Sequence, residues 1–225
     1  MCWSQRSSIV SFLLGSSACL YLFFRDVQSD RIYAIFFQFV IFMQFLEFLI
    51  WSDQPSVNKN CNSSPYEGKI NNVASQIASV QNLLQPLVAG LLVLYYINPA
   101  LYVFPSFLLK IIVGFYGVVI LWWILTVKVY TKKLCTIPIN GRHLDWPWIK
   151  SEISGNFIWV SYFTTLALVM ISILKIPGGK TLSAYLVVTM IISMSIYPFK
   201  KAAGSWWCVA AVGAPWLKIL FPKTL

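Results

Sequence analysis

Charged residues are scarce in this chain of 225 residues. Asp, Glu, Lys and Arg together make up 11% of the sequence, whereas hydrophobic residues make up 58%. The mean hydropathy is +0.71. A soluble domain needs a larger charged surface, so this composition excludes one and indicates a multi-pass membrane protein.

Three further absences narrow the class. The apolar run after residues 1–8 lacks a small-residue cleavage site of the usual form, so we expect no cleavable signal peptide. No internal repeat is visible, which leaves the inverted-repeat logic of many transporters without support. The net charge of +10 comes from cations scattered among short loops, with no basic stripe. Such cations face lipid headgroups or set topology, so we expect the lipid bilayer as a partner and no nucleic acid.

Seven apolar segments are each suited to cross a bilayer core of about 30 Å. The sequence therefore predicts an all-α integral membrane protein, a bundle of seven transmembrane helices that forms a single domain over residues 1–225. The predicted spans are residues 8–24, 32–51, 73–97, 106–127, 156–174, 181–197 and 205–221. With an odd number of spans the two termini lie on opposite sides, called here side A (N-terminal) and side B.

Several residues within the spans predict local features. Ser11, Gly15 and Cys19 recur every four residues, a stripe that lets another helix approach closely. Gly114 and Gly117 are expected to act as packing notches in the fourth span. Pro86, and Pro215 in the last span, predict kinks because proline cannot complete the helical hydrogen bonding.

Polar side chains in the second and third spans mark the predicted binding site. These residues are Gln44, Glu47, Gln81, Asn82 and Gln85. An ionisable group within a span costs about 2.5–3.5 kcal/mol on insertion scales, so Glu47 should point into the bundle, within reach of these amides or a water. The predicted ligand is a small molecule or an ion, and no cofactor is expected.

Most cysteines and tryptophans gather on side A. Cys2, Cys61, Cys135 and Cys208 form a predicted cluster there, and an aromatic rim is predicted from Trp3, Trp51, Trp146, Trp148 and Trp207. Four cysteines on one face allow two disulfides, a zinc site that includes His143, or unpaired thiols. No CxxC or HxxxH spacing is present, which argues against the metal.

The orientation signals conflict. Ten of the 17 Lys and Arg residues fall on side A, which by the positive-inside rule favours a cytosolic N-terminus. Against it, Asn62-Ser63-Ser64 is a glycosylation acceptor in a side A loop, and disulfides need an oxidising compartment. From the sequence we predict that side A faces the cytosol.

Three further polar residues have side chains that could take part in chemistry. His143 is the single histidine, in a side A loop with Asp145, and is most simply a structural loop residue. A catalytic role would require Asp145 or Glu47 as its partner. Lys218 lies near the side B end of the last span, where we expect it to snorkel to the interface.

Short motifs over nearly the whole chain carry a family resemblance. They are Met1-Cys2-Trp3-Ser4, Gln85-Pro86, His143-Leu144-x-Trp146 and Gly204-Ser205-x-Trp207-Cys208. With them the chain resembles a family of uncharacterised seven-helix membrane proteins known from bacteria, algae and giant DNA viruses. A cysteine follows the second span closely in that family, and the match of Cys61 is looser. The resemblance implies the fold and no activity.

Three functions remain open from the sequence. The first is binding or transport of a small molecule or ion through the pocket at Glu47 and the third-span amides. The second is a structural or assembly role in a cellular or viral membrane, with the polar groups joining helices. The third is a membrane enzyme, and it comes last because no nucleophile–base pair or metal cage is evident.

Overall fold

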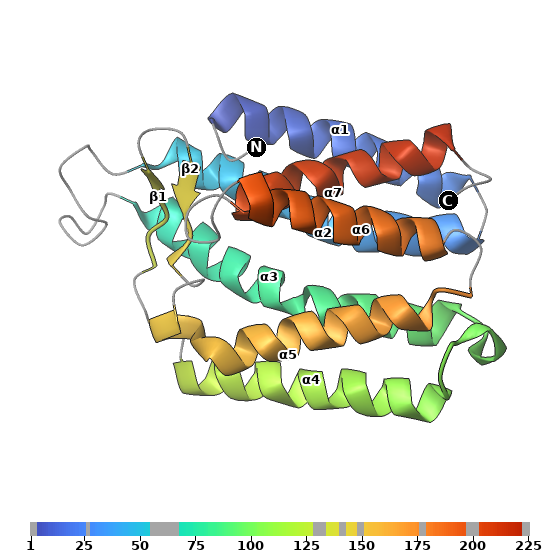
Figure 1. The fold of residues 1–225 in the computed structure, drawn as a ribbon. Helices are drawn as coiled ribbons and strands as arrows, with labels where there is room; N and C mark the ends of the chain where they lie inside the picture. The colour runs from blue at the N-terminus through green and yellow to red at the C-terminus, as the bar shows by residue number, and fades with distance from the viewer. Residues whose placement is uncertain are drawn as a thin grey trace.

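The computed structural model describes residues 4–25, 28–54, 68–127, 134–139, 143–147, 151–175, 179–196 and 203–221. These residues form seven α-helices, one short 3-10 helix and a two-stranded sheet (Figure 1). The helices are α1 (Gln5–Phe24), α2 (Gln28–Ser52), α3 (Lys69–Tyr96), η1 (Pro99–Leu101), α4 (Ser106–Val127), α5 (Ser151–Ser172), α6 (Gly179–Ile196) and α7 (Ala203–Leu220). Each predicted span overlaps one α-helix.

Four of the described helices are long and apolar enough to cross a membrane. These segments are Gln5–Phe24, Ser29–Ser52, Lys69–Tyr96 and Ser106–Thr126. Shorter apolar helical segments run over Asn156–Ser172 and Ala210–Leu220. The predicted helical fold is therefore confirmed, with four described helices that could cross a membrane by their length and composition. The side A ends of the helices gather at the left of Figure 1, and α7 ends at the right.

Side-chain oxygens accept hydrogen bonds at the N-terminal ends of α1 and α3. The Ser4 hydroxyl accepts a hydrogen bond from the Ser7 backbone N–H (3.2 Å) and so caps α1. The carboxylate of Asp53, just after α2, accepts from the backbone N–H groups of Ile70 (2.7 Å) and Asn71 (3.2 Å). An acceptor at this end of α3 also opposes the positive end of the helix dipole, which ties α2 to α3.

The helices form two groups. In one group α1, α2 and α7 pack against one another, and α6 packs on α7; in the other, α3, α4 and α5 pack together (Figure 1). The groups meet mainly where α2 packs on α3, and α6 touches α5 only lightly. Helix α2 is thus the centre of the bundle.

The small-residue stripe of α1 packs as predicted. Gly15 and Cys19 are buried, and a Cβ at Gly15 would lie 2.7 Å from Cδ1 of Ile41 on α2. Without a side chain at this position the two helices approach closely.

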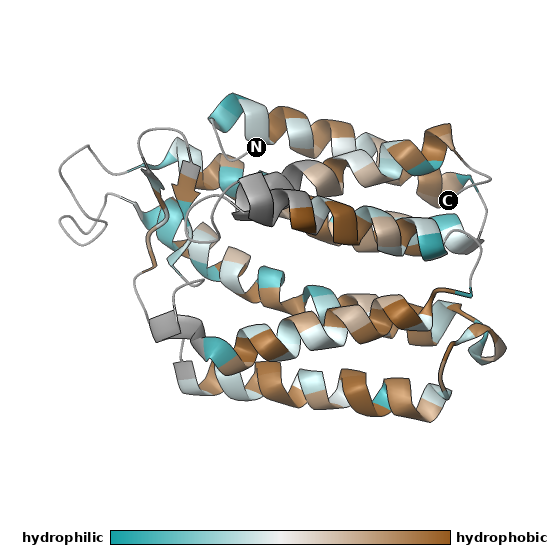
Figure 2. Cartoon of the chain, in the orientation of Figure 1, coloured by the Kyte–Doolittle hydropathy of each residue, from teal (hydrophilic) through white to brown (hydrophobic). Residues whose placement is uncertain are grey.

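Helix α4 faces outward with a broad apolar surface. Its exposed side chains include Phe107, Ile111, Phe115, Val118, Leu121, Trp122 and Leu125. Figure 2 shows α4 as hydrophobic over most of its length, whereas α3 carries hydrophilic segments part-way along. An exposed apolar band of this kind suits contact with lipid.

The predicted packing notches in α4 are only partly correct. Nothing lies within 4 Å of a Cβ built at Gly114, which faces outward, whereas one at Gly117 would lie 3.6 Å from Leu87. The tight contact between α3 and α4 is instead at Gly90, where an added Cβ would lie 2.4 Å from Cγ2 of Val113. The sequence pattern missed Gly90 because a lone glycine does not reveal which helix it meets.

The long loop between α4 and α5 contains a sheet that the sequence analysis did not predict. Strands β1 (Ile137–Ile139) and β2 (His143–Asp145) pair antiparallel, with Ile137 opposite Asp145 and Ile139 opposite His143. Buried Leu144 and Trp146 pack with side chains of α2 and α3, so the hairpin covers the side A ends of these two helices.

We predict that Gly90→Ala destabilises the bundle. The new methyl group overlaps the branched Val113 side chain, which has few rotamers to move into, and overpacking of this kind costs about 1–3 kcal/mol. Gly114→Ala is the matched control, because its methyl group meets open space. Unfolding in mixed detergent–SDS micelles should show a lower free energy of unfolding for Gly90→Ala and no change for Gly114→Ala. Equal stability of the two variants would contradict the close contact.

Candidate functional site

Three predicted site residues share one face of α2. Gln44, Glu47 and Trp51 follow at steps of three and four residues, which aligns them along the helix. Glu47 is fully buried and Gln44 is 1% exposed, while Trp51 is half-buried. The Ser8 hydroxyl of α1 donates to Oε2 of Glu47 (3.4 Å). Sequence reasoning missed this partner, since nothing in the first span singled out Ser8.

Three buried polar atoms on this face have no hydrogen-bond partner among the described residues. Both amide atoms of Gln44 and the indole nitrogen of Trp51 are buried, with no hydrogen-bond partner in the described part of the chain. A buried group left unsatisfied costs about 1–3 kcal/mol, so proteins rarely keep one without a reason. Buried donors and a buried acceptor without described partners therefore lie on the same face of α2 as the Glu47 carboxyl.

The predicted amides of α3 point to different neighbours. Gln81 donates through Nε2 to the backbone carbonyl of Phe39 on α2, and its Oε1 is buried without a described partner. Gln85 accepts a hydrogen bond from the Tyr162 hydroxyl of α5 (2.8 Å). Asn82 is half-buried. Because Phe39 precedes Glu47 by eight residues, or about 12 Å of helix, these amides lie deeper toward side B than Glu47.

The predicted aromatic rim is only partly described. Trp146 is 8% exposed and packs in a buried cluster with Met43, Leu46 and Ile50 of α2. It is therefore a core residue under the hairpin. Trp3 and Trp148 lie outside the described residues, as does the side chain of Trp207.

A second buried polar network anchors the hairpin. Asn71 of α3 donates through Nδ2 to the Thr136 carbonyl (2.9 Å), and its Oδ1 accepts from the Thr136 backbone N–H (3.0 Å). The hydroxyls of Ser75 and Thr136 lie 2.7 Å apart. All three residues are fully buried. These bonds fix the chain just before β1 to α3, which is a structural role.

Of the four cysteines in the predicted cluster, the structure describes the side chain of Cys135 alone. Cys135, next to Thr136, is disulfide-bonded, and Cys19 is a buried free thiol. Cys2 and Cys61 lie outside the described residues, and so does the side chain of Cys208. For Cys135 the disulfide interpretation therefore applies. The described residues contain no group of three His, Cys, Asp or Glu that could hold a metal ion.

His143 and Asp145 both lie on β2. Asp145 is half-buried, and the side chain of His143 is outside the described residues. Their backbones pair with β1. The strand gives the predicted loop pair a fixed backbone position over the ends of α2 and α3.

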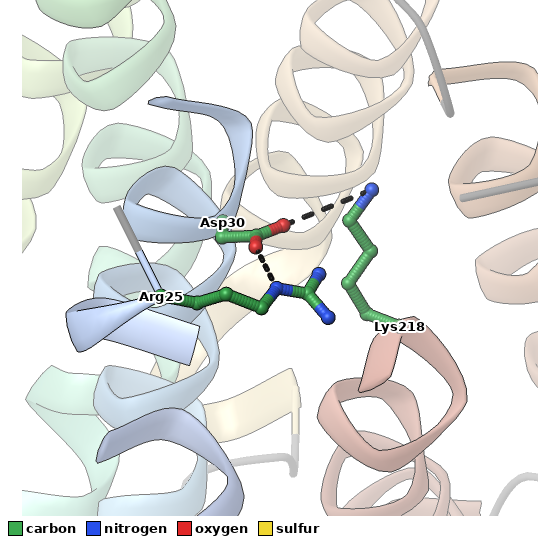
Figure 3. Close-up of polar contacts among 3 residues, drawn as sticks. All are labelled: Arg25, Asp30 and Lys218. Atoms are coloured by element: carbon green, nitrogen blue, oxygen red, sulfur yellow. Dashed lines mark hydrogen bonds and ion pairs between the residues drawn. The ribbon is translucent and has the colours of Figure 1, made fainter. Parts of the chain in front are cut away.

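Lys218 does not snorkel, in contrast to the expectation from sequence. Its side chain is 4% exposed, and its Nζ lies 3.9 Å from Oδ1 of Asp30, which is fully buried at the start of α2 (Figure 3). The other oxygen of Asp30 binds Nε of Arg25 at the end of α1. Three helices thus meet in one charge cluster, which we call the Asp30 cluster (Arg25, Asp30 and Lys218).

The Asp30 cluster has more positive than negative charge. It holds two cations and one carboxylate among the described side chains. The hydrogen bond from Arg25 to Asp30 raises the pKa of Arg25, so this guanidinium stays charged. Lys218 makes no hydrogen bond within the described chain, and its Nζ lies 5.2 Å from the centroid of the Tyr33 ring. Sequence reasoning missed this ion pair because Asp30 and Lys218 are far apart along the chain.

Comparisons of the chain with protein-family models, with curated proteins and with solved structures found no match. The geometry and chemistry of the described residues therefore carry the functional argument.

We predict that Asp30→Asn destabilises the protein strongly and that Lys218→Met changes its stability little. Asp30→Asn leaves two cations together without a described counter-charge, and breaking a buried ion pair in this way costs about 3–5 kcal/mol. Lys218→Met leaves the neutral Arg25–Asp30 pair and a side chain of similar length. Its effect should stay within about 1 kcal/mol. SDS-induced unfolding measures both, and a larger loss for Lys218→Met would refute this charge balance.

Proposed function

We propose that this chain is a seven-helix integral membrane protein that binds, and carries across the membrane, a small cation or cationic molecule at Glu47. One observation supports this proposal above the others. A fully buried carboxyl lies on the same face of α2 as Gln44 and Trp51, whose buried polar atoms have no described partner. A site that is complete without a guest would have satisfied these atoms.

Each residue has a role in this site. Glu47 supplies the negative charge, and its attraction for a cation is stronger in apolar surroundings than in water. The Gln44 side-chain oxygen faces the cationic group of the guest, whereas the amide N–H groups of Gln44 and the indole N–H of Trp51 donate to an oxygen that the guest carries, such as the hydroxyl of choline. The deeper amides of Gln81, Asn82 and Gln85 would meet the guest on its way through the bundle.

Transport in addition to binding would follow the interior face of α2. Its buried residues follow at alternating steps of four and three residues: Tyr33, Phe37, Val40, Gln44 and Glu47. This line runs from the side B end of α2 to the polar site in its side A half. In the described arrangement Phe37 and Val40 close the line, so passage requires these apolar side chains to move.

A structural role is the second candidate, and specific contacts favour it for some of the amides. Gln85 with Tyr162, and Gln38 with the Ser16 hydroxyl (3.1 Å), are satisfied hydrogen bonds between helices. Bonds of this kind contribute about 0.6 kcal/mol on average to helix association in membranes. Gln44 differs from these residues because its amide atoms have no described hydrogen-bond partner, which favours a binding site over a purely structural role.

We predict that Glu47→Gln abolishes ligand stabilisation without loss of the fold. The detergent-purified protein would be heated with sodium, potassium, methylammonium or choline chloride at equal ionic strength. At a saturating concentration, at least one of these cations should raise the unfolding midpoint of the wild type by about 5 °C. Glu47→Gln keeps the shape but removes the charge, so the increase should disappear.

Gln38→Leu is the matched control for this experiment. It removes a polar group of the same helix on the face toward α1, so cation stabilisation should stay as in the wild type. The structural role would be favoured if no cation stabilises the wild type and both variants unfold earlier. Uptake of the stabilising cation into proteoliposomes then tests transport separately from binding.

We further propose that side A faces an oxidising compartment. The disulfide at Cys135 supports this orientation, because thiols in the cytosol are kept reduced. It opposes the cytosolic N-terminus that the distribution of Lys and Arg favours. The cation count is the weaker signal here, since side A leads by only ten to seven.

This orientation predicts glycosylation at Asn62. Expressed in mammalian cells, the chain should migrate faster after treatment with peptide-N-glycosidase, because its side A acceptor Asn62-Ser63-Ser64 lies in the lumen. Asn62→Gln should remove this shift. If an acceptor site engineered into the side B turn between α5 and α6 is modified and Asn62 is not, the orientation is reversed.

A further inference from the structure

An apolar cavity lies in the side B half of the bundle. Its volume is about 70 Å³, below the range of about 300–1,000 Å³ found for ligand pockets, so a longer ligand requires the lining side chains to move apart. Four helices form its walls: Phe36 and Phe37 come from α2, Leu92 from α3, Val169 from α5 and Leu186 from α6. Such a lining suits a hydrocarbon chain and offers nothing to a small polar ion.

The cavity reaches the side B ends of all four helices. Its lining includes Ser29 in the first turn of α2, Ile97 at the end of α3, Ile173 just after α5 and Gly179 at the start of α6. A ligand in the cavity therefore has one end in the bundle and the other at the level where α2 begins.

The Asp30 cluster lies beside this end of the cavity. Asp30 follows Ser29 directly, and Tyr33 both lines the cavity and lies under the Lys218 ammonium, 5.2 Å from the ring centroid. One aromatic ring thus separates the ammonium from the cavity. Lys218 is 3% exposed and makes no hydrogen bond to the described residues, and the 3.9 Å to Asp30 exceeds a direct hydrogen bond.

We propose that the cavity binds a single-chain lipid with a carboxylate head, that is, a fatty acid. The chain enters the apolar cavity and widens it by moving the lining side chains, and the carboxylate displaces the Tyr33 ring enough to accept hydrogen bonds from Lys218. This proposal is independent of the site at Glu47, which lies in the other half of α2.

The charges favour a carboxylate over a phosphate. Among the described side chains the Asp30 cluster carries one net positive charge, which one carboxylate neutralises. A phosphate monoester carries about −1.5 to −2 at neutral pH. The excess would then lie against the Asp30 carboxylate, and a neutral alcohol would leave Lys218 uncompensated.

The test uses the protein in nanodiscs of neutral phosphatidylcholine, with the fluorescent fatty acid cis-parinaric acid as the probe. Palmitic acid should displace the probe at a concentration about tenfold or more below that of hexadecanol, because only the acid pairs with the buried ammonium. Palmitoyl lysophosphatidic acid should compete less well than palmitic acid. Equal competition by acid and alcohol would overturn the proposal, and stronger competition by the phosphate would overturn the choice of carboxylate.

Variants locate the binding. Lys218→Met should lower the affinity for palmitic acid to that for hexadecanol, whereas Lys110→Met, an exposed lysine in the side B half of α4, should bind as the wild type does. Ala89→Phe fills the cavity and should weaken both ligands. Unchanged acid preference in Lys218→Met contradicts the proposal; should that variant aggregate, the acid–alcohol comparison in the wild type and the loss in Ala89→Phe decide.

Discussion

The packing of α2 on α3 holds the two groups of helices together. In a bilayer the lipid chains are as apolar as the helices, so close packing and hydrogen bonds have to supply the attraction. This seam has both. Ala74 and Ala78 of α3 leave room for Met43, Leu46 and Ile50 of α2. Gln81 then bonds across the seam to the backbone of Phe39. Asp53 and the hairpin secure the side A end, so both candidate sites are built on a helix that is fixed on several sides.

The sequence predicts the helices well because apolar length is a local property. Each predicted span overlaps a helix, and the small-residue stripe at Gly15 and Cys19 is buried as expected. Glu47 is buried, as the cost of facing lipid requires. These features depend only on which residues follow one another along the chain, and no partner needs to be known.

The features that the sequence did not predict depend on partners that are distant in the chain. Lys218 has the pattern of a snorkelling residue, and only the packing of α7 on α2 brings it to Asp30. The outward position of Gly114 and the close contact at Gly90 likewise follow from the rotation of α4 against α3. The short β1–β2 hairpin escaped notice because three-residue strands carry too little alternation to stand out.

The light contact between α6 and α5 has a consequence for how a lipid would arrive. A ligand that already dissolves in the bilayer could part these two helices and slip in sideways, without first entering water. Its local concentration is then set by its mole fraction in the surrounding leaflet. A modest affinity suffices under such conditions, and occupancy would follow the composition of the membrane. The fraction of protein with bound lipid would then report the lipid composition of the bilayer around it.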